Sequence, residues 1–127
     1  MKLLGIDYGT KRIGVATCDT DVGMAFPKAV LKNDNNVVSV LKDLCQKEEI
    51  EKIILGESKN LNGEDNKIFE EIKRFKASVE NATAIETIFQ PEFYTTYQAS
   101  RIQGDSEMID ASAATIILQS YVDRFKN

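Results

Sequence analysis

The sequence contains no histidine among its 127 residues. This absence excludes Ser-His-Asp and Cys-His nucleophilic systems, and it also excludes zinc sites with histidine ligands. Any chemistry must therefore use carboxylates, hydroxyl groups, lysines or metal-bound water.

Cysteine and long apolar runs are also scarce. The two cysteines, Cys18 and Cys45, are far apart and lack metal-ligand spacing, so we expect two reduced, mostly buried thiols. No apolar run approaches the ~20 residues needed to cross a bilayer, and Met1-Lys2 leads directly into a strand instead of a signal-peptide core. We therefore expect a cytoplasmic protein that has no membrane partner.

The composition is that of an ordinary globular protein, with 43% hydrophobic and 28% charged residues and only two prolines. The length suits one domain, residues 1–127. The net charge of −4 argues against a general electrostatic attraction to nucleic acid. The charge is uneven, because residues 1–32 carry five cations against three carboxylates and the remainder carries −6.

Local patterns predict three strands of a meander, followed by helices that alternate with strands. Pro27 places the third strand toward an edge, because proline cannot donate to a ladder. Asn33 and Asp34 are good caps for the helix that follows. The predicted strands are 2–7, 11–18, 23–31, 52–56 and 84–90; the predicted helices begin near 33, 68, 95 and 110. The last helix is expected to bury Ala113, Ile116, Ile117 and Tyr121. This order describes a three-layer α/β/α sandwich around a five-stranded mixed sheet.

Four carboxylates stand where this fold would gather them. Asp7 ends the first strand, Glu57 ends the fourth, Glu92 lies just beyond the fifth, and Asp110 begins the last helix. Ligands of open α/β sheets bind beyond the carboxyl ends of parallel strands. Clustered carboxylates repel one another unless a cation is present, and Mg²⁺ or Mn²⁺ is the natural partner. Two such ions about 3.5–4 Å apart support in-line phosphoryl displacement.

Each of these acids also has a simpler interpretation. Asp7 could be a turn-forming residue, although an acid that closes a buried strand is unusual. Asp110 could cap its helix, where the helix dipole favours a carboxylate. Glu57 and Glu92 could be solvated loop acids.

Several other polar residues are candidates for substrate binding. Lys11, Arg12 and Lys59 could engage phosphate, although exposed cations are common in hairpins and loops. Thr95 and Thr96 most simply cap the helix that follows them.

Four segments carry a resemblance to a known family: GIDYGTKRIGVA (5–16), NLNG (60–63), EFYTTYQA (92–99) and IDASAATIILQSYVD (109–123). In this order they resemble the YqgF family of Holliday-junction-resolvase-like proteins, which are described as nucleases of pre-16S rRNA. The resemblance implies a ribonuclease-H-like fold and a metal-dependent endonuclease that matures the 5′ end of small-subunit rRNA. It implies pre-rRNA, branched DNA or small-subunit precursors as partners, and an acidic triad of Asp7, Glu92 and Asp110.

The sequence also departs from the family pattern. Pro91-Glu92-Phe93 stands where the family usually has Asp-Glu-Arg, and Gly56-Glu57-Ser58 stands where it usually has Gly-Leu-Pro. Glu57 is a candidate fourth ligand that would restore an acid. Two other functions stay open: a non-catalytic module bound to nucleic acid or the ribosome, and a phosphate-binding fragment related to sugar kinases and actin-like ATPases.

Overall fold

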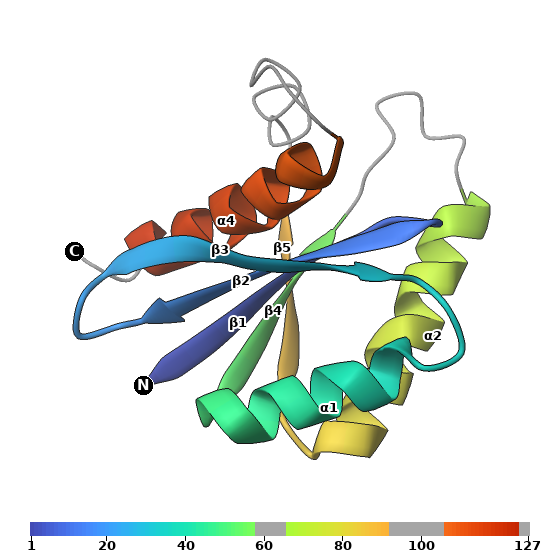
Figure 1. Cartoon of the computed structure of the whole chain (residues 1–127), viewed down its shortest axis with the longest axis horizontal. Helices are drawn as coiled ribbons and strands as arrows, with labels where there is room; N and C mark the ends of the chain where they lie inside the picture. Colours follow the sequence, from blue (N-terminus) through green and yellow to red (C-terminus); the bar gives the residue numbers. More distant parts are fainter. Residues whose placement is uncertain (58–65, 92–105, 125–127) are drawn as a thin grey trace.

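The structure, a computed structural model, describes residues 1–57, 66–91 and 106–124. Within these ranges the chain forms a meander of three strands, after which helices alternate with strands, as the sequence predicts (Figure 1). The elements are β1 (Lys2–Tyr8), β2 (Arg12–Asp19), β3 (Met24–Lys32), α1 (Val37–Glu48), β4 (Lys52–Glu57), α2 (Asn66–Thr83), β5 (Thr87–Pro91) and α4 (Ser106–Arg124).

The strands form one mixed sheet in the order β3-β2-β1-β4-β5. β2 pairs antiparallel with both β1 and β3, whereas β4 pairs parallel with both β1 and β5. Because β1, β4 and β5 run in the same direction, their last residues meet at one end of the sheet. We call this the carboxyl end of the sheet.

Helices cover both faces of the sheet (Figure 1). One core lies between the sheet and helices α1 and α2, and it contains Leu4 of β1 together with Leu41 and Ile72. The other core lies between the sheet and α4, and it contains Leu3 of β1 together with Leu118. Successive residues of β1 thus enter opposite cores, as the alternation of a strand requires. The result is the predicted three-layer α/β/α sandwich.

The two cysteines belong to different cores, Cys45 to the one under α1 and Cys18 to the one under α4. Both are free and buried, which confirms the prediction. Burial raises the pKa of the Cys45 thiol to about 11, so this thiol is protonated at neutral pH.

The third strand lies at an edge of the sheet, as Pro27 predicts. Pro27 pairs with Ala16 and Ala29 pairs with Val15, so Lys28 is an extra residue opposite β2. Such a bulge bends the strand, and proline withholds a backbone donor. Both features suit an edge strand.

The last helix differs from the prediction in its start and in its buried face. It begins at Ser106, four residues before Asp110. Within the predicted stripe, Ile116 and Tyr121 are only partly buried. Residues 111–118 are almost all small or apolar, so their periodicity does not select one face. The buried residues of this helix are Ala113, Ala114, Ile117, Leu118 and Val122.

The starts of α1 and β5 also differ from the prediction by a few residues. α1 begins at Val37 after the cap residue Asn36, and the carboxylate of Asp34 accepts the Asn36 N–H at 2.9 Å, so Asp34 closes the preceding turn instead. β5 begins at Thr87, because α2 continues to Thr83 and Ala84 adopts a left-handed conformation with φ 59°. The predicted loop at 60–63 and short helix at 95–103 lie outside the described residues. No helix in the described ranges is long and apolar enough to cross a membrane.

Candidate active site

Asp7 lies at the carboxyl end of the sheet, on the face that α4 covers. It is the sixth residue of β1, it is half-buried, and it pairs with Gly14 of β2. Leu3, Gly5 and Asp7 alternate onto the same face of β1, and Leu3 belongs to the core under α4. Asp7 therefore lies inside a strand, whereas the turn-forming interpretation would place it in the loop.

The pairing of β4 with β5 determines where the backbone of Glu57 lies. Gly56 pairs with Gln90, and Glu57, the last residue of β4, pairs with Pro91, the last residue of β5. The backbone of Glu57 thus lies at the carboxyl end of the sheet. The side chain of Glu57 and the whole of Glu92, which follows Pro91 in the sequence, lie outside the described residues.

Helix α4 crosses β1 directly over Gly5. A Cβ atom at Gly5 would lie 2.7 Å from Cβ of Leu118 and 3.1 Å from the carbonyl oxygen of Ala114. Only a glycine allows so close an approach of a helix to a strand. Figure 1 shows α4 running across the sheet in the direction opposite to β1. The first turns of α4 therefore lie toward the carboxyl end of the sheet.

The position of this crossing determines where the backbone of Asp110 lies along the sheet. Asp110 precedes Ala114 by four residues, which is about 6 Å along a helix. Asp7 follows Gly5 by two residues, which is about 7 Å along a strand. Both positions are displaced from the same crossing point in the same direction, so the backbones of both residues lie toward the carboxyl end of the sheet. The side chain of Asp110 lies outside the described residues.

The capping interpretation of Asp110 is wrong. Asp110 is the fifth residue of α4, past the first turn, whereas a cap precedes the first helical residue. Sequence reasoning placed the helix start at Asp110 because the more polar residues before it do not continue the apolar pattern.

The turn between β1 and β2 is tied to the end of β3. A Cβ atom at Gly9 would lie 2.4 Å from the carbonyl oxygen of Arg12, so this turn requires glycine. The side-chain amide of Asn33 donates to the Gly9 carbonyl at 2.8 Å, and its backbone N–H donates to the Lys11 carbonyl at 3.0 Å. These bonds fix the segment that carries Lys11 and Arg12.

The predicted substrate-binding residues are described only in part. Lys11 is exposed in the turn, and Arg12 is half-buried at the start of β2. Lys59, Thr95 and Thr96 lie outside the described residues. Sequence reasoning assigned no role to Gly5, and it predicted Asn33 as a helix cap, whereas Asn33 instead binds the β1–β2 turn. A glycine inside a buried strand is the signal that would have indicated the close approach at Gly5.

The donor set suits a hard divalent cation. All four predicted ligands are carboxylates, the ligand type that Mg²⁺ and Mn²⁺ prefer. Asp7 is the only one of the four whose side chain the structure describes, and the described residues alone contain no group of three or more candidate ligands. The donor chemistry and the position of Asp7 fit such an ion.

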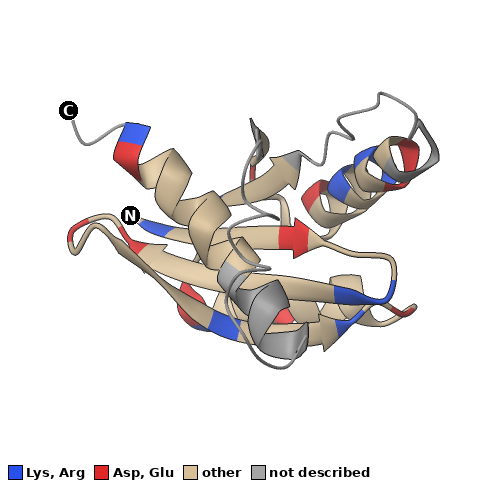
Figure 2. Cartoon of the chain, turned by 90° about the horizontal axis from the view of Figure 1, so that it is seen from above, with Lys and Arg blue, Asp and Glu red and all other residues tan. Residues whose placement is uncertain are grey.

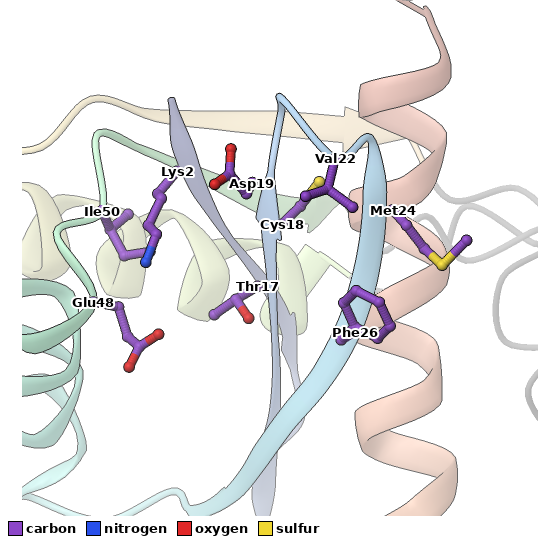
Figure 3. Close-up of a pocket in the computed structure, with 9 residues that line it drawn as sticks. All are labelled: Lys2, Thr17, Cys18, Asp19, Val22, Met24, Phe26, Glu48 and Ile50. Carbon is purple, nitrogen blue, oxygen red and sulfur yellow. The ribbon is translucent and has the colours of Figure 1, made fainter.

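A cavity of about 230 Å³ lies at the other end of the sheet (Figure 3). Lys2, at the start of β1, and Asp19, at the end of β2, both line it. Val22, Met24 and Phe26 add an exposed apolar rim. None of the described site residues lines this cavity, so it is separate from the candidate site.

Comparison with protein families gives a match over nearly the whole chain. The model of the family described as "RuvX: Holliday junction resolvase" matches residues 1–124. A protein of Syntrophus aciditrophicus, named "Putative pre-16S rRNA nuclease", is 36% identical over 134 residues, with 97% of this chain and 89% of that protein covered. A protein of the same name from Caldanaerobacter subterraneus subsp. tengcongensis is 35% identical over 138 residues, with 100% and 99% covered.

Comparison with solved structures supports the fold independently. Thermus thermophilus RuvC, solved in complex with a Holliday junction substrate, superposes with a TM-score of 0.66. The match covers 98% of this chain and 96% of that chain at 14% identity. The architecture is therefore the RuvC-like, ribonuclease-H-like fold.

Proposed function

Because the chain belongs to the RuvX family, also called YqgF, we propose that it is a metal-dependent endonuclease that hydrolyses phosphodiester bonds at the 5′ end of small-subunit rRNA precursors. Family membership supports a nuclease, and the names of the relatives indicate the rRNA substrate. We propose further that residues 1–127 act as a single cytoplasmic domain, since the proposed site draws on elements from β1 to α4.

The observation that supports this proposal is that Asp7 lies on the α4 face at the carboxyl end of the sheet. Helix α4 crosses β1 at Gly5 with its first turns toward the same end. A fold gains no stability from gathering carboxylates, because they repel one another in the absence of a cation. The arrangement is therefore better explained by a function than by folding.

In the proposed site, Asp7, Glu92 and Asp110 hold Mg²⁺ or Mn²⁺, with Glu57 as a fourth ligand. When bound, the metal activates a water molecule and stabilises the leaving oxygen of the phosphodiester. The backbone of Asp7 is held by the β1–β2 ladder, so the position of this residue is fixed before the substrate binds. Lys11, Arg12 and Lys59 hold phosphate oxygens, while Thr95 and Thr96 donate hydrogen bonds to them.

Substitution of Asp7 tests the proposal. We expect Asp7→Asn to reduce cleavage of a pre-16S rRNA 5′ fragment in Mg²⁺ or Mn²⁺ by at least about 10²-fold, because an amide is a weaker ligand than a carboxylate. Asp43→Asn, an exposed change of the same kind on α1, should cleave like the wild type. Equal rates for Asp7→Asn and the wild type would disprove the proposed site.

A non-catalytic module is the second candidate. Two observations favour it: the net charge of −4, and Phe93 where the family usually has arginine. Such a module would bind the same RNA without cleaving it in either metal. Binding weakened by salt, together with unchanged RNA on a denaturing gel, would select this function.

A further inference from the structure

Gln90 of β5 is a buried polar residue whose side chain uses only part of its hydrogen-bonding capacity. The residue is only 5% exposed. Nη1 of Arg124 donates to its Oε1 at 3.0 Å. Because arginine is only a donor, this contact identifies the atom that faces Arg124 as the amide oxygen and leaves the amide nitrogen with two N–H groups. No residue in the described ranges accepts a hydrogen bond from this nitrogen.

The two unused N–H groups of Gln90 are unfavourable for folding. Buried polar groups nearly always have a hydrogen-bond partner, and a buried donor without an acceptor lowers the free energy of unfolding. An apolar side chain of the same length, such as methionine, would fill the same space without this penalty. The amide nitrogen is therefore better explained by an acceptor that binds beside it than by packing.

Gln90 lies on the same face of the sheet as Asp7. Ile88 packs against the core under α4, whereas Phe89 packs against the core under α1 and α2, so Gln90 alternates onto the α4 face. The hydrogen bond from Arg124, the last residue of α4, agrees with this placement. Figure 2, which views the sheet from the side of α4, shows this helix lying across the strands.

Gln90 also lies in the same row across the sheet as Asp7. Gly56 of β4 pairs with Gln90. On the other side of β4, Ile6 pairs with Leu55. The next step of this register places Asp7 beside Gly56. Neighbouring strands are about 4.8 Å apart, so the backbones of Asp7 and Gln90 are about 10 Å apart. Gly56 has no side chain, so no side chain of β4 stands between the two.

We infer that Gln90 is a positioning residue of the candidate site, whose amide N–H groups donate to an oxygen ligand, a water or a carboxylate, of the divalent ion that Asp7 binds. The inference rests on the proposed function and adds a residue that the sequence alone did not indicate. Mg²⁺ lies about 2.1 Å from each oxygen ligand, and an N–H···O bond spans about 2.9 Å. An ion, one such ligand and one hydrogen bond therefore fit between the side chains of Asp7 and Gln90. Arg124 occupies Oε1, the atom through which an amide binds a cation, so Gln90 acts through its nitrogen.

The test measures metal binding without nucleic acid, from the rise in melting temperature as Mg²⁺ or Mn²⁺ is added. Removal of a hydrogen-bond partner of a metal ligand typically weakens metal binding by about 10–100-fold. We expect Gln90→Met and Gln90→Leu, which both lack N–H groups, to raise the Kd of the ion by about this factor. In EDTA both variants should melt within a few degrees of the wild type, because removal of the unsatisfied donors offsets the lost bond to Arg124.

Thr87→Val, which removes a buried hydroxyl group at the opposite end of the same strand, is the matched control and should keep the Kd of the wild type. An unchanged Kd in both Gln90 variants would overturn the inference. An increase in only one of them would also overturn it, because that result would reflect packing, and so would the lack of any metal response in the wild type. If the wild type binds the ion but cleaves no RNA, the proposed function fails and this inference stands.

Discussion

At the scale of single residues, Gly5 determines how closely helix α4 packs on the sheet. The backbone of α4 and the Leu118 side chain occupy the space that a side chain at this position would need. The sequence motif around Asp7 thus contains two different requirements. Asp7 supplies a carboxylate, and Gly5 allows α4 to pack closely on β1.

Gly5→Ala should therefore destabilise the protein. The added methyl group would lie 2.7 Å from Cβ of Leu118, so α4 must move away from β1. Overpacking of this kind costs about 1–3 kcal/mol of the free energy of unfolding. Urea denaturation measures it, with the exposed change Ser39→Ala on α1 as the control. An unchanged urea midpoint in Gly5→Ala would contradict the close packing.

Residue types predicted part of the candidate site. Asp7 was predicted correctly as the acid at the end of the first strand, because an acid after an apolar run is visible in the sequence. The role of Gly5 was not predicted, because the residues that it approaches, Ala114 and Leu118, are more than a hundred positions away in the sequence. The ligand roles of all four acids, Asp7, Glu57, Glu92 and Asp110, stay predictions.

At the scale of elements, Glu80 links the end of α2 to the start of β5. Its carboxylate accepts the backbone N–H of Thr87 at 3.2 Å and the ammonium of Lys76 at 3.1 Å. The hydrogen bond from Thr87, followed by that from Lys76, holds the pKa of Glu80 below its ordinary value. This carboxylate connects the last turns of α2 to the first residue of β5.

Glu80→Gln should change how stability depends on pH. A carboxyl group with a lowered pKa in the folded state stabilises the protein at neutral pH, and this contribution disappears as the pH falls from about 4 through the lowered pKa. The wild type should therefore be more stable than Glu80→Gln at pH 7, and the difference should shrink toward pH 3. Urea midpoints across this range measure the effect.

Glu70→Gln is the matched control, because Glu70 pairs with Lys73 on the exposed surface of the same helix. Its stability curve should run parallel to that of the wild type. If the curve of Glu80→Gln is also parallel, the link between α2 and β5 does not depend on the charge of Glu80.

The order and type of the described elements could be predicted from the sequence, but some boundaries could not. The strands are short apolar runs bounded by glycine, proline or polar residues, and these are local signals. The start of α1 moved because Asp34 closes a turn instead of capping the helix. The buried face of α4 was only half predicted, because that segment is apolar on several sides and the sheet selects one of them. Local sequence patterns specify which helices and strands form, whereas packing against the sheet specifies which face of a helix is buried.

At the scale of the whole molecule, the proposed site should link metal binding to stability. An ion that binds only the folded protein at ten times its Kd adds about 1.4 kcal/mol, or roughly 4–7 °C in the melting temperature of a domain of this size. Thermal unfolding with increasing Mg²⁺ or Mn²⁺ measures this shift.

Asp7→Asn should melt at a higher temperature than the wild type in EDTA, because one of the mutually repelling carboxylates is gone, and it should respond little to either ion. Asp43→Asn should respond like the wild type. A full metal response in Asp7→Asn would show that the ion binds elsewhere.

The contact between Gly5 and Leu118 joins residues more than a hundred positions apart in the sequence. A ribosome therefore completes β1 long before α4 emerges, and any sheet formed by then has the face that α4 covers still exposed. Contacts that close such long loops form late, which slows folding. In a growing chain, β1 and α4 can pack against each other only after residues 106–124 have been synthesised. Translation thus keeps the proposed nuclease inactive until nearly the whole sequence has been read.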